Sequence, residues 1–137
     1  MANTLYDVAR KQFLEGGINW LTDNVKCMLI AGSNYSPNFS THMYLSDIPT
    51  SARVTPGVLL TGKATTGGAA DANDVTFSAV PSTSPQVTAV LLYIDTGTES
   101  TSTLIAWLDT GTGLPITPNG GDIIVTWDNG VNKIFRL

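Results

Sequence analysis

The sequence predicts a mainly β protein: an antiparallel β-sandwich or a small jelly-roll-like barrel of about six to eight strands, with one N-terminal helix. Short apolar runs recur along the chain, separated by clusters of Gly, Pro, Ser or Asp at roughly hairpin spacing. Thr, Ser, Gly and Asn are abundant, and these residues favour strands and turns over helices. Charged residues make up only 13% of the chain, whereas an average soluble domain has about 25%.

The first segment is the one good helix candidate. Thr4 can cap it, with Asp7 in the place of the usual Glu of a capping box. Three apolar residues recur every four positions on one face, namely Leu5, Ala9 and Phe13. The pair Gly16-Gly17 then ends the helix. We expect segment 1–23 to pack on the body of the domain; the alternative is an arm that docks on another subunit.

The pattern changes to strands after Asn24. VKCMLIAG at 25–32 is the first strand candidate, and a long irregular connection with two prolines follows at 34–53, with a short helical turn expected at 42–45. Connections of this length usually make contacts or carry function. Further strand candidates lie at 54–62, 74–80, 86–94, 104–108, 122–127 and 131–135.

The C-terminal segment carries the clearest turn signal. Apolar IIVTW and VNKIF flank Asp128-Asn129-Gly130, and Asn-Gly is the preferred pair of a two-residue type I′ turn. The sequence therefore predicts a closing hairpin whose last residues belong to a sheet. No linker divides the chain, so residues 1–137 form one predicted domain, large enough to bury roughly two-thirds of its unfolded surface.

Charge argues against two classes of partner. The net charge is −4, and no Lys, Arg or His lies between Lys63 and Lys133, so the electrostatic footprint of a nucleic-acid-binding protein is missing. The sequence also lacks a basic amphipathic helix, a signal peptide and an apolar run of about 20 residues. We expect synthesis and folding in a cytoplasm. The sole cysteine, Cys27, lies in an apolar run and is expected to be a buried, inert thiol.

Asp-Thr-Gly-Thr occurs twice after an apolar run, at Asp95 and at Asp109. This pattern is typical of aspartic proteases, in which two carboxylates about 3 Å apart share a proton. If the two apolar runs are adjacent antiparallel strands, the two aspartates lie at opposite ends of the pair and cannot meet within one chain. A dimer that contributes one aspartate from each copy is the alternative. We interpret both motifs as turns in which Asp accepts backbone N–H groups.

Three other motifs are incomplete. GVLLTGKAT, from Gly57 to Thr65, matches part of a phosphate-binding loop, but Ala64 lacks the required hydroxyl and no helix pattern follows. Oxygen ligands for Ca²⁺ could come from Asp71, Asn73 and Asp74, but their spacing falls short of a calcium loop. His42 is the only histidine, so neither a histidine metal site nor a Ser-His-Asp triad is expected.

We therefore predict no catalytic, cofactor-binding or metal-binding residue. The three tryptophans, Trp20, Trp107 and Trp127, sit in or beside apolar runs and are interpreted as core or interface anchors. An aromatic platform for carbohydrate is the alternative for these residues.

Four stretches carry a resemblance: INWLTDNVKCMLI, THMYLSDIP, LTGKATTGG and, as the most specific, TPNGGDIIVTWDNGVNKIFRL. They resemble a family of small structural proteins of tailed bacteriophages and prophages, and the resemblance spans nearly the whole chain. It implies a non-enzymatic, β-rich virion component present in many copies. The role we expect is a cement or decoration protein that binds the major capsid protein on the outside of the capsid.

This hypothesis predicts a virion protein made in the host bacterial cytoplasm, without cofactors, that assembles as a dimer or trimer. The N-terminal segment or the 33–53 loop would reach the neighbouring subunit. The alternative is a tail, baseplate or fibre component that binds a receptor or glycan. The third hypothesis is a dimeric aspartic protease, which would be an enzyme and not a structural protein.

Overall fold

The computed structural model describes residues 4–109, 114–127, 130 and 133–137. Within these residues the fold is mainly β, with ten strands, one α-helix and three short 3-10 helices. The N-terminal half contains β1 (Thr4–Leu5), α1 (Asp7–Glu15), β2 (Val25–Ile30), η1 (Leu45–Asp47), η2 (Thr50–Ala52), β3 (Val58–Leu59) and β4 (Ala64–Thr66). The C-terminal half contains β5 (Ala69–Asp71), β6 (Val75–Phe77), β7 (Ala89–Ile94), η3 (Glu99–Thr101), β8 (Leu104–Leu108), β9 (Ile123–Val125) and β10 (Phe135–Arg136).

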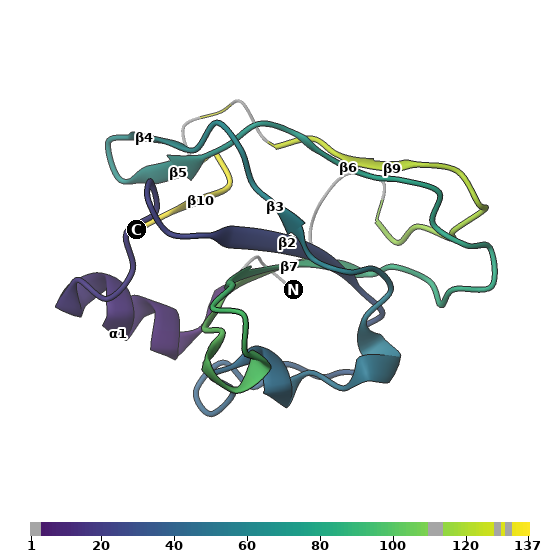
Figure 1. Ribbon diagram of the computed structural model, residues 1–137, viewed down its shortest axis with the longest axis horizontal. Coiled ribbons are helices and arrows are strands. Elements are labelled where there is room, and N and C mark those ends of the chain that lie inside the picture. The colour runs from purple at the N-terminus through teal and green to yellow at the C-terminus, as the bar shows by residue number, and fades with distance from the viewer. Residues whose placement is uncertain (1–3, 110–113, 128–129, 131–132) are drawn as a thin grey trace.

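The described strands form three antiparallel sheets. The central sheet has the order β1-β8-β7-β2-β3, and two smaller sheets have the orders β10-β5-β4 and β6-β9. Figure 1 shows the two smaller sheets on one side of β2 and β7, and the 3-10 helices of the 34–53 connection on the other. The predicted mainly β fold with one N-terminal helix is confirmed. Of the two predicted forms, the structure is sandwich-like, because the sheets are not closed into a barrel.

The central strands are buried on both faces. β2, β7 and β8 read VKCMLI, AVLLYI and LIAWL, and such near-continuous apolar runs are typical of strands covered on two sides. Side chains alternate along β2, so Cys27 and Leu29 join one core while Met28 and Ile30 join another. Each fully buried aliphatic side chain of this kind contributes about 1.5–3 kcal/mol to folding.

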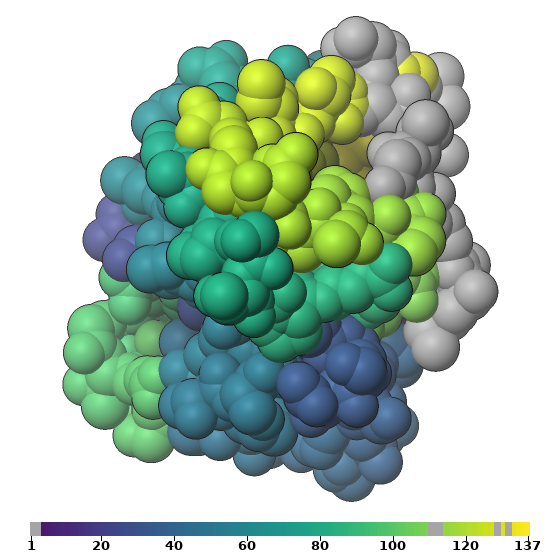
Figure 2. Space-filling model, turned by 90° about the vertical axis from the view of Figure 1, so that its right-hand side faces the viewer, coloured from purple at the N-terminus to yellow at the C-terminus, as the bar shows by residue number. Residues whose placement is uncertain are grey.

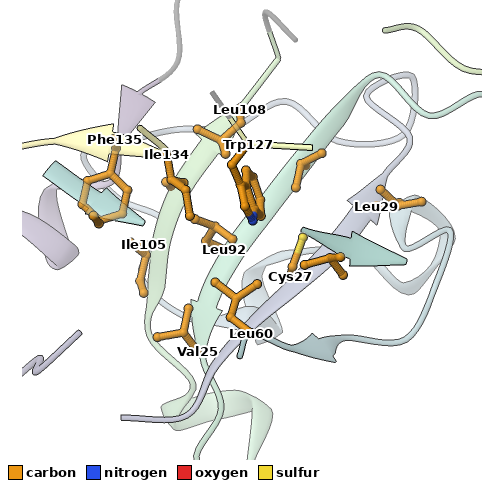
Figure 3. Packing of buried hydrophobic residues seen from close by; sticks show 14 of the residues in the cluster. Val25, Cys27, Leu29, Leu60, Leu92, Ile105, Leu108, Trp127, Ile134 and Phe135 are labelled. Atoms are coloured by element: carbon orange, nitrogen blue, oxygen red, sulfur yellow. The ribbon is translucent and has the colours of Figure 1, made fainter. Parts of the chain in front are cut away.

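The first core lies between the central sheet and the two smaller sheets. Figure 3 shows its side chains converging from strands that are far apart in the sequence, with Trp127 and Phe135 among residues of β2, β7 and β8. The labelled members are Val25, Cys27, Leu29, Leu60, Leu92, Ile105, Leu108, Trp127, Ile134 and Phe135. The C-terminal residues thus complete the core and belong to a sheet, as predicted.

The 34–53 connection covers the opposite face of the central sheet. Tyr35, Leu45, Ile48 and Ala52 are buried there, and the Ala31 N–H donates to the Ala52 carbonyl over 2.8 Å. The helical turn expected at 42–45 lies slightly later, as η1. The long connection therefore makes its contacts with its own sheet, where it shields one face from water.

The N-terminal helix differs from the prediction at its start. Thr4 is paired with Trp107 in β1, and the residue before the helix is Tyr6, so the expected Thr4–Asp7 capping box is wrong. Because Thr4 and Leu5 pair with β8, the helix begins only at Asp7, and Thr4 lies two residues before the N-cap position. Gly16 ends α1 in a left-handed conformation, as expected. Val8 and Ala9 are buried, and α1 packs against β8 of the same chain.

The strand pairing differs from the prediction in two places. The hairpin β4–β5 was not predicted, because its sequence ATTGGAAD has no apolar alternation. The predicted closing hairpin is wrong in its pairing: β9 pairs with β6, and β10 pairs with β5. Asn129, the first residue of the expected type I′ turn, lies outside the described residues.

Candidate functional site

The two aspartates of the repeated motif lie at opposite ends of one strand pair. In the antiparallel β7–β8 pair, Val90 faces Leu108 and Tyr93 faces Leu104. Asp95 follows the end of β7, and Asp109 follows the end of β8. The separation expected from the sequence is confirmed, and these carboxylates cannot share a proton within one chain.

Asp95 acts as a turn residue. Its Oδ1 accepts the Gly97 N–H at 3.0 Å, and Gly97 has a φ of 86°, which glycine adopts without strain. Its Oδ2 lies 2.8 Å from Lys26 Nζ. The Lys26 ammonium, followed by the Gly97 N–H, lowers the pKa of Asp95 below its ordinary value. The carboxylate is therefore ionised at neutral pH and stabilises the exit from β7.

Asp109 has a different environment. Its Oδ2 accepts the indole N–H of Trp107 at 3.1 Å, which places the carboxylate beside the end of β8. The rest of the second Asp-Thr-Gly-Thr motif, residues 110–113, lies outside the described residues, so the predicted second turn stays a prediction.

The incomplete phosphate loop is a strand followed by a turn, as expected. Val58 and Leu59 form β3, Gly62 has a φ of 60°, and the next element is strand β4. The segment therefore offers no helix N-terminus to a phosphate at this position.

The Asp71–Asp74 loop binds tryptophans in this structure. The indole N–H of Trp20 donates to the Asp71 carbonyl at 3.0 Å, and that of Trp127 donates to the Asn73 carbonyl at 2.9 Å. Asp74 Oδ1 accepts the backbone N–H of Trp127 at 3.1 Å. Across the described part of the chain, no three His, Cys, Asp or Glu residues are grouped to hold a metal ion.

All three tryptophans are buried. Trp20 and Trp127 belong to the first core, and Trp107 belongs to the second. They are core anchors of the subunit, and the alternative of an aromatic carbohydrate platform is wrong for them because a platform must present its ring faces to solvent. Cys27 is also buried, and burial raises the pKa of its thiol well above the ordinary range, which fits the expected inert thiol.

Three ring side chains form a hydrogen-bonded chain that sequence reasoning missed. The hydroxyls of Tyr6 and Tyr35 lie 2.9 Å apart, and the Tyr35 hydroxyl lies 2.8 Å from His42 Nδ1. The same Nδ1 accepts the Asn38 N–H at 3.1 Å. Burial, and then the hydrogen bond with Tyr35, raises the pKa of Tyr6 well above its ordinary value. This chain joins the N-terminal segment to the 34–53 connection and has a structural role.

A cleft lies where the start of the 34–53 connection meets the end of β8. Its volume is about 490 Å³, within the size range of small-ligand sites. The lining residues are Gly32, Tyr35, Ser36, Pro37, Thr88, Trp107, Asp109, Leu114 and Pro115. Figure 2 shows this side of the molecule, with the start of the 34–53 connection (blue) below and the segment after residue 114 (yellow-green) above it.

The walls of this cleft are fixed by local contacts. The rings of Tyr35 and Trp107 pack with centroids 5.5 Å apart, and the Gly32 N–H donates to Thr88 Oγ1 at 2.8 Å. Asp109 is the acidic group of the lining, and its orientation is set by the Trp107 indole. The sequence could not indicate this cleft, because its residues come from four separate segments.

Comparison with known proteins adds no assignment: no protein-family model matches this chain, and no curated protein matches its sequence. Among the residues that the structure describes, none of the helices has the length and apolar character needed to cross a membrane.

Proposed function

We propose that this protein is a non-enzymatic structural component of a bacteriophage virion that binds the outside of the capsid and stabilises it. Two lines of support exist. The first is the resemblance of the C-terminal stretch TPNGGDIIVTWDNGVNKIFRL, and of three shorter stretches, to small structural proteins of tailed phages. The second is an apolar end of the molecule that is suited to protein contact.

This apolar end carries the proposal. Leu14, Leu21 and Leu137 are 89%, 52% and 63% exposed. Phe135 connects the elements that bear them, because its ring lies 6.0 Å from that of Phe13 and 5.3 Å from that of Trp20. Figure 1 shows α1 and the C-terminus at the same end of the molecule. Exposed large apolar side chains on elements at one end of a molecule are candidates for a protein-contact surface.

The segment that carries Leu21 is held in place by hydrogen bonds. Asn19 Oδ1 accepts the Leu21 N–H at 3.1 Å, and Asp23 Oδ2 accepts the Asn19 N–H at 2.9 Å. Lys63 donates to the Asp23 carbonyl and ties the turn to the segment before β4. An apolar side chain on a pre-ordered turn loses little conformational entropy when a partner covers it, which is what a many-copy capsid contact requires.

The partner we propose for this end is the major capsid protein, with the subunits assembled as dimers or trimers in the virion. Because α1 and the 34–53 connection pack on their own subunit, the exposed leucines are better candidates for the contact than an extended arm. A cement protein works by bridging neighbouring coat subunits, so the capsid gains resistance to heat and internal pressure.

The test uses capsids that lack the protein. We expect near-stoichiometric binding of the native protein and a higher temperature of capsid disruption. The double variant Leu14→Ser/Leu21→Ser should fold and lose most of this binding. Ile124→Ser is the matched control, because Ile124 is an apolar side chain that is 63% exposed but lies on β9, far from α1 (Figure 1). Recovery of the protein only with purified tails, or full binding by the double variant, would overturn the proposal.

A further inference from the structure

We propose that His42 is a pH-sensitive switch: when its imidazole takes up one proton, the Asn38–His42 turn opens and uncovers Tyr6. The proposal rests on the hydrogen bonds at His42 Nδ1, which fix where each hydrogen lies. It does not depend on the proposed virion role, because it concerns the second core and not the apolar end of the molecule.

The neighbours of His42 determine its protonation in this structure. The Asn38 N–H can only donate, and it lies 3.1 Å from Nδ1, so Nδ1 carries no hydrogen and the neutral ring holds its hydrogen on Nε2. The Tyr35 hydroxyl, 2.8 Å from the same nitrogen, must then also donate to it. Since its single hydrogen is used there, Tyr35 accepts from the Tyr6 hydroxyl at 2.9 Å. The hydrogen bonds therefore run in one direction, from Tyr6 through Tyr35 to His42.

Uptake of a proton reverses this direction. A proton from water adds at Nδ1, because Nε2 already holds one, and both nitrogens of the charged imidazole are donors. The Asn38 N–H then faces another N–H and loses its acceptor. Nδ1–H donates to the Tyr35 oxygen, and the Tyr35 hydrogen turns to the Tyr6 oxygen. The hydrogen of the fully buried Tyr6 loses Tyr35 as its acceptor, which costs free energy in a buried site.

The Asn38–His42 turn covers Tyr6, so these losses act on one contact. The Phe39 ring packs edge-on against the Tyr6 ring, with centroids 5.1 Å apart. The Phe39 carbonyl accepts the Asp7 N–H at 2.8 Å, and the Asn38 carbonyl accepts the His42 N–H at 2.9 Å. Protonation removes the side-chain bond that joins the two ends of the turn and weakens the tyrosine beneath it, so the turn opens.

Charged groups on the neighbouring elements allow this protonation inside the folded chain. They are, in chain order, Asp7 and Arg10 of α1, Asp47 of η1 and Asp109 after β8. The ion pair of α1 is internally compensated, whereas Asp47 has an electrostatic interaction with His42. A nearby carboxylate favours the charged imidazole. Burial raises the pKa of Tyr6 and of Tyr35, so both stay neutral between about pH 5 and pH 8, where histidine changes charge.

The primary test measures amide hydrogen exchange in the full-length native protein by NMR, from about pH 7.5 to about pH 5. We expect the protection factor of the Asn38 N–H, which is corrected for the intrinsic pH dependence of exchange, to fall at least roughly tenfold, the ratio for about 1.4 kcal/mol. The Asp7 N–H should lose protection in parallel, because its acceptor Phe39 moves with the turn. The Gly97 N–H is the control amide, since the Asp95 carboxylate that binds it is paired with a lysine and stays ionised.

The imidazole gives a second measurement on the native protein. His42 is the only histidine, so its ring nitrogen signals need no assignment by mutation. We expect the Nε2–H form at the alkaline end of the range, and uptake of one proton with the same midpoint as the loss of Asn38 protection.

Four results of these two measurements would overturn the proposal. They are an Nδ1–H form at neutral pH, a ring that stays neutral down to about pH 5, constant Asn38 protection while the ring titrates, and loss of Asn38 protection without loss at Asp7. The last result would show that one bond breaks while the turn stays closed.

A variant then assigns the effect to His42. In His42→Asn the side-chain oxygen can accept the Asn38 N–H in place of Nδ1, and it gains no proton in this range. We expect the protection of Asn38 to be independent of pH in this variant. Glu15→Gln, at the exposed end of α1, should keep the native pH dependence. A folded His42→Asn variant that still loses protection in acid would reject the proposal, and the coincidence of the two native titrations decides the question if this variant does not fold.

Discussion

Trp20 and Trp127 donate their indole N–H groups to the same short loop, at the carbonyls of Asp71 and Asn73. One tryptophan precedes β2 and the other follows β9, so the loop links the two ends of the chain. Asp74 adds a third bond by accepting the Trp127 backbone N–H. The three polar residues that could have been calcium ligands thus lie in a loop that orients two core side chains.

This arrangement predicts that Asp74→Ala destabilises the protein by about 1 kcal/mol, because the Trp127 N–H loses its acceptor. Urea unfolding followed by tryptophan fluorescence measures the change. Glu15→Gln is the control, since its ion pair with Lys11 is exposed and contributes little. We also expect that neither Ca²⁺ nor a chelator changes the unfolding midpoint, and a calcium-dependent midpoint would contradict the structural role of the loop.

The chain of Tyr6, Tyr35 and His42 predicts an asymmetry between two similar substitutions. Tyr35→Phe removes the central hydroxyl and leaves the buried Tyr6 hydroxyl without this partner, whereas Tyr6→Phe removes the terminal hydroxyl and leaves Tyr35 bonded to His42. We expect a loss of about 1 kcal/mol for Tyr6→Phe and about 2 kcal/mol for Tyr35→Phe. Urea unfolding of both variants provides the comparison. Equal losses of stability would show that the Tyr35 hydroxyl is no more important than the Tyr6 hydroxyl in this hydrogen-bonded group.

Acid should weaken the contribution of Asp95. Its pKa is lowered in the folded protein by Lys26, so this stabilisation is present above the unfolded pKa and is lost as the pH falls through the folded value. We expect Asp95→Asn to be less stable than the native protein at pH 7 and to approach it as the pH is lowered below about 4. Unfolding curves at several pH values test this. A constant difference down to pH 2 would contradict the linkage.

The sequence was most informative where apolar runs are long. The runs at 25–30, 89–94 and 104–108 became the central strands, because a run buried on both faces has few alternatives to a covered sheet. It was least informative where a strand forms because of its pairing partner. The sequences of β4 and β5 carry little apolar alternation, and Thr4 lies in a strand because β8 pairs with it.

The candidate site was likewise predictable only in part. The distance between Asp95 and Asp109 could be predicted, because strand direction alone decides it. The cleft beside Asp109 could not, since its wall combines residues that are up to 83 positions apart, from Gly32 to Pro115. Contacts of this kind depend on how the 34–53 connection lies on the sheet, and no local pattern encodes that.

Gly97 offers a test of backbone conformation alone. It has a φ of 86°, and a Cβ added there would meet no atom within 4 Å. A substitution is therefore limited by backbone strain and not by space. We expect Gly97→Val to lower the free energy of unfolding by at least about 1 kcal/mol, because β-branched residues resist positive φ, and Gly97→Asn to lower it less.

Urea unfolding of both variants separates strain from loss of the Asp95 turn, since the Gly97 N–H that binds Asp95 is retained in each. Thr98→Val serves as a control for a β-branched apolar residue in the same turn, because Thr98 is already extended. If Gly97→Val is as stable as Gly97→Asn, the left-handed conformation at this position is not required, and the exit from β7 does not depend on the Asp-Thr-Gly turn.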